Sequence, residues 1–159
     1  MKRTIIAAAV VGLLTAAPVA AHGPSGHGDH KHEPAYGRAG DPKMLSRDIV
    51  VRMKEADGKM LFEPSRIEIR TGEQIRFRLE NVGDLDHEFL LGTAQEIEEH
   101  ADMMKAMPDM KHDDANAKQI AAKRTGDLLW HFTTAGEFDF ACLIPGHREA
   151  GMTGKIVVK

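Results

Sequence analysis

The only cysteine of this 159-residue chain, Cys142, shares one short loop with His147 and Met152, in the spacing C-x4-H-x4-M. A thiolate, an imidazole and a thioether are ligands that copper prefers, and a second histidine would complete a trigonal His2Cys site with a weak axial methionine. The candidate for that histidine is His87, which follows turn-forming residues at 81–83. The alternative is a buried free cysteine beside a surface histidine and a core methionine. Because three ligand types rarely coincide at loop spacing beside a Pro-Gly pair, the sequence favours the metal site.

The first 21 residues have the composition of a secretory signal. Lys2 and Arg3 precede an apolar stretch at 5–17, and small residues at 19–21 provide a cleavage site. We therefore expect residues 1–21 to be removed and the mature chain to be periplasmic, or outside the cell, without a segment that spans a membrane. A retained membrane anchor is the alternative, but the apolar stretch is short and rich in alanine for a span.

Charge and cysteine count limit the classes of function. Without Lys2 and Arg3 the chain has 19 basic and 24 acidic residues, a formal charge of −5, so its surface is unlike that of a nucleic-acid-binding protein. One cysteine cannot form an internal disulfide, and a lone thiol in an oxidising compartment is open to oxidation or intermolecular pairing. Ligation to a metal removes that liability, so the cysteine count supports the metal site independently of the loop spacing.

Residues 22–45 are rich in glycine, proline, histidine and charge, and they have almost no apolar periodicity. We expect this segment to be disordered or loosely attached to the domain that follows it. Short histidine-rich tracts of this kind bind metal, so the segment could collect copper or deliver it near the main site. A solvated tail without function is the alternative. The accessory ligand candidates are His22, His27, His30 and His32.

Residues 46–159 are predicted to form one domain. In the segments 65–70 and 74–80, apolar residues alternate with charged ones, which is the pattern of a sheet with one solvated face. Short strands at regular spacing, separated by turn residues, predict an all-β antiparallel sandwich. The remaining strands are expected at 48–54, 60–62, 87–91, 128–133, 138–142 and 154–158.

A helix-forming segment at 93–124 interrupts the strands. Thr93 and Glu96 fit a capping box at its start, and the helix should end near Pro108 and resume over 114–123. Its soft donors could bind Cu(I) as accessory ligands, since thioethers favour that ion. Packing of the methionines against the sandwich is the alternative. The soft donors are Met103, Met104, Met107 and Met110, with His100 and His112 near them.

The stretch 136–158 resembles the C-terminal ligand loop of the cupredoxins, the small blue-copper proteins, and the resemblance extends over 48–159. It implies a Greek-key β-sandwich with a helical insertion between two strands, and one type 1 copper ion. The two extra segments are also similar in composition to the His- and Met-rich extensions of periplasmic copper-tolerance cupredoxins. Carried over residue by residue, the resemblance implies four ligands, which are His87, Cys142, His147 and Met152.

These features predict a copper-handling or copper-tolerance protein with one-electron Cu(I)/Cu(II) chemistry. The alternative is a soluble electron carrier that works between periplasmic redox partners through an exposed edge of His147. An enzyme is the weaker hypothesis, because protein side chains fill all four positions and a catalytic metal needs one open to substrate. Expected partners are copper ions and a periplasmic redox protein, copper exporter or oxidase, and we expect a monomer.

Overall fold

The computed structural model describes residues 34–107 and 114–159. In these two stretches, no helix combines the length and the apolar character needed to cross a bilayer. The predicted signal peptide at 1–21 lies outside the described residues, and so do several of the accessory ligand candidates. These are His22, His27, His30, His32, Met110 and His112.

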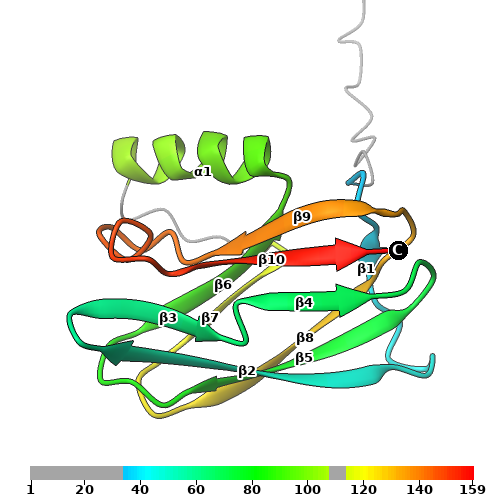
Figure 1. Cartoon of the computed structure of the whole chain (residues 1–159), viewed down its shortest axis with the longest axis horizontal. Helices are drawn as coiled ribbons and strands as arrows, with labels where there is room; N and C mark the ends of the chain where they lie inside the picture. The colour runs from blue at the N-terminus through cyan, green and yellow to red at the C-terminus, as the bar shows by residue number, and fades with distance from the viewer. Residues whose placement is uncertain (1–33, 108–113) are drawn as a thin grey trace, which may run out of the picture. The chain divides into compact units, whose positions relative to one another are not determined.

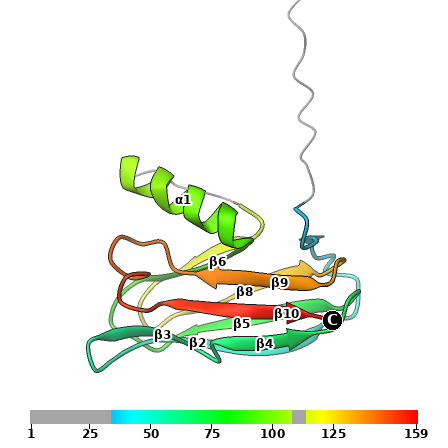
Figure 2. The ribbon, with the colours of Figure 1, turned by 45° about the horizontal axis from the view of Figure 1, so that its top comes forward.

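Ten strands in the described residues form two five-stranded sheets that face each other (Figure 1, Figure 2). The strand order is not sequential in either sheet, and α1 (Ala94–Ala106) lies between β6 and β7, which confirms the predicted sandwich with a helical insertion. Across the first sheet the strands are β1 (Arg38–Ala39), β8 (Thr125–His131), β5 (Gln74–Asn81), β2 (Arg47–Ala56) and β3 (Lys59–Glu63). Across the second they are β4 (Arg66–Ile69), β10 (Thr153–Val158), β9 (Gly136–Ala141), β6 (His87–Gly92) and β7 (Ala117–Ile120).

The core lies between the two sheets and is rich in aromatic side chains. The predicted alternation is confirmed in β5, where Ile75, Phe77 and Leu79 are fully buried and Arg78 is exposed. Ring contacts link side chains from both sheets, so that the strands leading to and from the metal-ligand candidates are packed on one another. The rings in contact belong to Phe62, Phe77, Phe89, Phe132 and Phe140.

Two strand pairs are parallel, whereas the sequence predicts an antiparallel sandwich. β2 pairs in parallel with β5, and β4 pairs in parallel with β10. Parallel neighbours need a crossover connection. Here the chain provides one by passing from β3 in the first sheet to β4 in the second and back to β5. The alternation of apolar residues shows which face of a strand is buried but not which strand lies beside it, so it could not predict this pairing.

The helical segment begins as predicted, but its second half is not helical. Thr93 caps α1 and forms a capping box with Glu96. The prediction of a helix over 114–123 is wrong, because a turn there leads into β7, which pairs with the edge of β6. Pairing of the backbone with a sheet edge, together with burial of Ile120, outweighs the weak local preference for helix.

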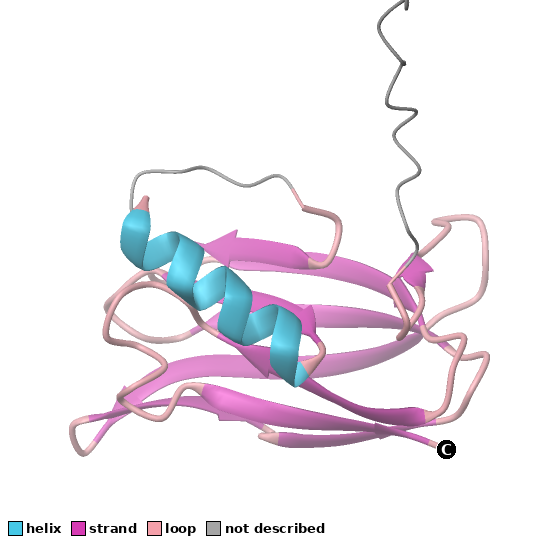
Figure 3. Ribbon diagram, turned by 90° about the horizontal axis from the view of Figure 1, so that it is seen from above, coloured by secondary structure: helices cyan, strands magenta, loops and turns pink. Residues whose placement is uncertain are grey.

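Helix α1 lies across one face of the strands, as Figure 3 shows from above. Ile97 and Ala101 on its inner side pack in one apolar cluster with Leu143, the residue directly after Cys142. An ion pair of 2.6 Å between Arg148 Nη2 and Glu98 Oε2 links the helix to the same loop. The insertion therefore supports the loop that carries the metal-ligand candidates.

The end of the segment 22–45 is not loosely attached, contrary to the expectation from sequence. Tyr36 is buried and stacks on Trp130 at a ring-centroid distance of 5.3 Å, and its hydroxyl donates a hydrogen bond of 3.1 Å to the carbonyl of Leu91. The short strand β1 then pairs with the end of β8. One tyrosine can dock a polar segment, since such a ring buries about 150–250 Å². The overall composition of a segment does not reveal the effect of one such residue.

We expect Tyr36→Ala to lower the free energy of unfolding of the copper-free protein by about 3–5 kcal/mol, as for other large aromatic side chains truncated in a core. The matched variant Tyr36→Phe should cost about 1–2 kcal/mol, because it keeps the ring and removes the two hydrogen bonds of the hydroxyl, which donates to Leu91 and accepts from Asn116 Nδ2 at 3.0 Å. The carbonyl of Leu91 would retain its 2.7 Å bond from Asn116 Nδ2. Urea denaturation measures both values, and equal small losses would mean that this docking contributes little to stability.

Candidate metal centre

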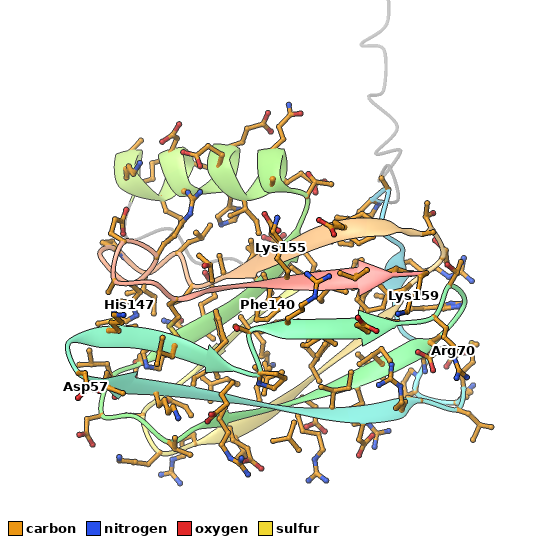
Figure 4. All side chains as sticks on the ribbon, in the orientation of Figure 1. Asp57, Arg70, Phe140, His147, Lys155 and Lys159 are labelled. Carbon is orange, nitrogen blue, oxygen red and sulfur yellow. The ribbon has the colours of Figure 1, made fainter. Side chains whose placement is uncertain are left out.

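Three side chains from two distant parts of the sequence bring their donor atoms together at one end of the sandwich. His87 Nδ1 lies 3.2 Å from His147 Nδ1, and Cys142 Sγ lies 3.4 Å from the same His147 atom. One donor atom from each residue lies within 4.8 Å of the other two, and all three residues are buried. Figure 4 shows His147 at the end of the sandwich near Asp57, away from Lys159. Two imidazole nitrogens and one sulfur are the donor set of a trigonal copper site, so these residues fit a copper ion.

Neighbouring strands of the second sheet place the first two donors. β6 and β9 are antiparallel, with Leu90 opposite Ala141, so the start of β6 and the end of β9 lie side by side. His87 is the first residue of β6, and Cys142 directly follows β9. The backbone N–H of Glu88 donates a hydrogen bond of 3.3 Å to Cys142 Sγ, which stabilises negative charge on the sulfur.

The loop from Cys142 to Met152 closes on itself through its backbone. The N–H of Cys142 donates to the carbonyl of Met152, and the N–H of Met152 donates to the carbonyl of His147, each at 3.1 Å. Gly146 has a φ of +88°, a conformation that glycine adopts without strain. Met152 is fully buried. The loop therefore ends with the predicted axial residue directly before β10, buried in the same core cluster as Cys142.

Burial favours the neutral forms of Cys142 and His147 in the copper-free protein. It raises the pKa of the Cys142 thiol to about 12, although the N–H groups of Glu88 and Ile144 act in the opposite direction. Burial also lowers the pKa of His147, and the neighbouring His87 adds to this effect. A metal must therefore displace a proton from the cysteine, whereas His147 is already neutral and ready to bind at neutral pH.

Copper affinity is expected to rise about tenfold per pH unit between about pH 7 and 9, because each bound ion releases one proton from Cys142 over this range. The lowered pKa of His147 keeps its own proton out of this balance until the pH falls below about 6.5. Competition titration of Cu(I) against a chelator of known pH dependence measures the slope. A slope of zero would mean that the thiolate already exists in the copper-free protein.

One polar contact of the site was missed in the sequence analysis. Glu55, near the end of β2, accepts a hydrogen bond of 2.8 Å from His87 Nε2. Its oxygens also accept hydrogen bonds from the N–H groups of Asp84 and Leu85, at 3.0 and 3.1 Å. Burial alone would raise the pKa of Glu55, but these hydrogen bonds together outweigh it and hold the pKa below its usual value. The carboxylate is therefore ionised at neutral pH.

The buried Asn81 organises the loop that precedes His87. Its side-chain amide donates hydrogen bonds to the carbonyls of Leu85 and Ile120, at 2.8 and 3.0 Å. Its carbonyl oxygen accepts the N–H of Gly83 at 3.0 Å. These bonds tie the loop before His87 to the end of β7.

The soft donors on α1 do not share one environment. Met104 packs against the apolar cluster under the helix, as the packing alternative predicts. Met103 and Met107 are 41% and 49% exposed. His131, the last residue of β8, is not on the helix. Its Nε2 lies 3.2 Å from the carbonyl oxygen of Gly72.

The chain belongs to the plastocyanin/azurin family of copper-binding proteins, whose family model matches residues 49–159. The matched region includes all four predicted ligands of the main site, and copper is the cofactor of the family. The geometry of the centre and the family therefore agree on the metal.

Two relatives extend the similarity to most of the chain. The copper-resistant cuproprotein CopI of Rubrivivax gelatinosus is 47% identical over 140 residues, which cover 87% of this chain and 83% of the relative. The copper-resistant cuproprotein CopI of Pseudomonas aeruginosa is 34% identical over 166 residues, covering 86% and 90%.

Solved structures share the fold at low sequence identity. Auracyanin B matches 78% of this chain and 96% of its own, with a TM-score of 0.63 and 19% identity. A multicopper oxidase from Campylobacter jejuni, a metallo-oxidase, matches 75% of this chain but 31% of its own, with a TM-score of 0.53 and 13% identity. These likenesses concern the fold and carry no conclusion about activity.

Proposed function

We propose that this protein is a periplasmic type 1 copper protein that serves copper tolerance, with copper held by His87, Cys142, His147 and the weaker axial ligand Met152. The convergence of three buried donors within 4.8 Å carries this proposal. Bound copper would supply one-electron Cu(I)/Cu(II) chemistry. The copper-resistance names of relatives at 47% and 34% identity support the role in tolerance.

The site is proposed to be non-catalytic. A catalytic metal needs a coordination position that substrate can reach. His87, Cys142 and Met152 are fully buried, and His147 is 7% exposed. This burial supports storage or electron exchange rather than turnover of a substrate.

The proposed location depends on the signal peptide predicted at 1–21, whose removal would leave His22 at the start of a periplasmic chain. The structure begins to describe the chain just before β1, which lies at the end of the sandwich away from His147 (Figure 1, Figure 4). The histidine-rich tract itself lies outside the described residues. We propose that it collects copper as a separate element.

Electron transfer between periplasmic partners is the second candidate function. Val82 and Leu85, in the loop that leads to His87, are each 45% exposed, and they offer an apolar surface to a redox partner. An electron carrier was expected to use an exposed edge of His147, but this side chain is only 7% exposed.

Copper titration of the mature protein tests these proposals. Cu(I) and Cu(II) would be added to the wild type, to a deletion of residues 22–32, and to the double variant Met103→Leu, Met107→Leu. For a tolerance protein we expect more than one tightly bound copper, with the additional ions lost in the deletion or the double variant. The thiolate-to-copper absorption band should be the same in all three proteins, because the main centre is intact.

Strict one-to-one binding with rapid electron exchange would instead favour the electron carrier. Absence of an intense charge-transfer band in the wild type would overturn both functions. Oxidation of Cu(I) with multiple turnovers would contradict the non-catalytic proposal, and oxygen consumption measures it.

A further inference from the structure

The carboxylate of Glu55 reaches the metal centre from the opposite sheet. Its Oε1 lies 2.8 Å from His87 Nε2, while Nδ1 of the same ring faces His147 Nδ1 at 3.2 Å. A carboxylate only accepts hydrogen bonds, so Nε2 carries the ring proton in this arrangement. The lone pair of Nδ1 is then free for a metal, on the side where the other donors converge.

The surrounding loop is shaped around this carboxylate. Hydrogen bonds from the N–H groups of Asp84 and Leu85 hold its two oxygens. At Gly83, an added Cβ atom would overlap the carboxylate oxygens of Glu55. The N–H of Gly83 is in turn bound by the buried Asn81. Three hydrogen-bond donors hold the carboxylate, and a glycine leaves room for it. The contact with His87 is therefore a specific feature of the structure and not the chance approach of a surface side chain.

We propose that Glu55 is a positioning residue that fixes the tautomer of His87 and biases bound copper towards Cu(II), an inference that rests on the proposed copper site. A carboxylate that accepts the second N–H of a metal-bound imidazole raises the basicity of that ligand. Negative charge near the ion also favours the dication over the monocation. Both effects lower the reduction potential of the centre.

The variant Glu55→Gln keeps the size of the side chain and removes its charge. We expect it to retain the charge-transfer band and to lower the ratio of Cu(II) to Cu(I) affinity about tenfold, which for one electron raises the reduction potential by about 59 mV. The matched control is Glu80→Gln, which removes the same charge from a residue paired with Arg52 on the outer face of the sheet. Because solvent screens that position, its ratio should change by less than about twofold.

The variant Gly83→Ala keeps the charge but displaces the carboxylate. We expect it to shift the reduction potential in the same direction as Glu55→Gln, since neither variant keeps a charged carboxylate against His87 Nε2. A shift of Glu55→Gln no larger than that of Glu80→Gln would overturn the proposal. Glu55→Gln and Gly83→Ala still test the proposal if the more severe variant Glu55→Ala, which removes the side chain beyond Cβ, does not fold.

The His87 tautomer can be measured without copper. Nitrogen-15 NMR of the copper-free wild type should show the proton of the His87 ring on Nε2, and Glu55→Ala should lose this preference. A wild-type ring with its proton on Nδ1 would contradict the proposal. If the wild type lacked the copper band altogether, the proposed function would fail, and this measurement would still judge the role of Glu55.

Discussion

Replacing Cys142 with serine should abolish the intense charge-transfer absorption of the copper-loaded protein and weaken copper binding more than about 100-fold, since loss of an outer partner of a ligand alone costs about 10–100-fold. A serine hydroxyl is a hard donor that stays protonated, whereas copper in a His2Cys site is bound by a soft thiolate. The copper-free variant should fold, because the substitution changes one buried atom. Absorption spectroscopy and chelator competition measure the two effects.

The matched control is Met152→Leu, which removes the thioether and keeps an apolar side chain of similar volume. Because an axial methionine is a long and weak ligand, this variant should retain the band and most of the affinity. If Cys142→Ser kept the band, or if Met152→Leu lost it as completely, the assignment of these two residues would be wrong.

Replacing Phe89 with alanine should lower the free energy of unfolding of the copper-free domain by about 3–5 kcal/mol. Phe89 is fully buried, and its ring centroid lies 5.0 Å from that of Phe140 and 5.1 Å from that of Phe77. Small domains are stable by about 5–15 kcal/mol, so this loss is a large part of the total. Phe89 is two residues from His87, so copper affinity should fall as well.

Two variants control this prediction. Phe89→Leu keeps most of the buried volume and should cost less than about 1.5 kcal/mol. Val50→Ala, on the exposed face of β2 at 39% exposure, should change the stability by less than about 0.5 kcal/mol. Urea denaturation monitored by circular dichroism gives all three values. Equal losses for Phe89→Ala and Val50→Ala would mean that the aromatic cluster does not form the core.

Glu55 illustrates a signal that was present in the sequence but not used. Val51 and Met53 are the inward-facing residues of β2, and Glu55 occupies the next position of the same alternation. A charged residue on the inward side of a strand needs a partner, because burying an unpaired charge is costly. The pattern therefore pointed to a buried contact for Glu55, although it could not name His87.

Local patterns in the chain were enough to predict the donor set, the two-layered β architecture and the start of α1. The spacing of Cys142, His147 and Met152 places three donors on one loop, and alternation and capping depend on residues within a few positions of one another. The parallel pairing of β2 with β5, the strand at Ala117–Ile120 and the docking of Tyr36 emerged only from the folded chain. Each depends on contacts between residues far apart in sequence. The local sequence around either partner alone has no periodic pattern that would reveal such a contact.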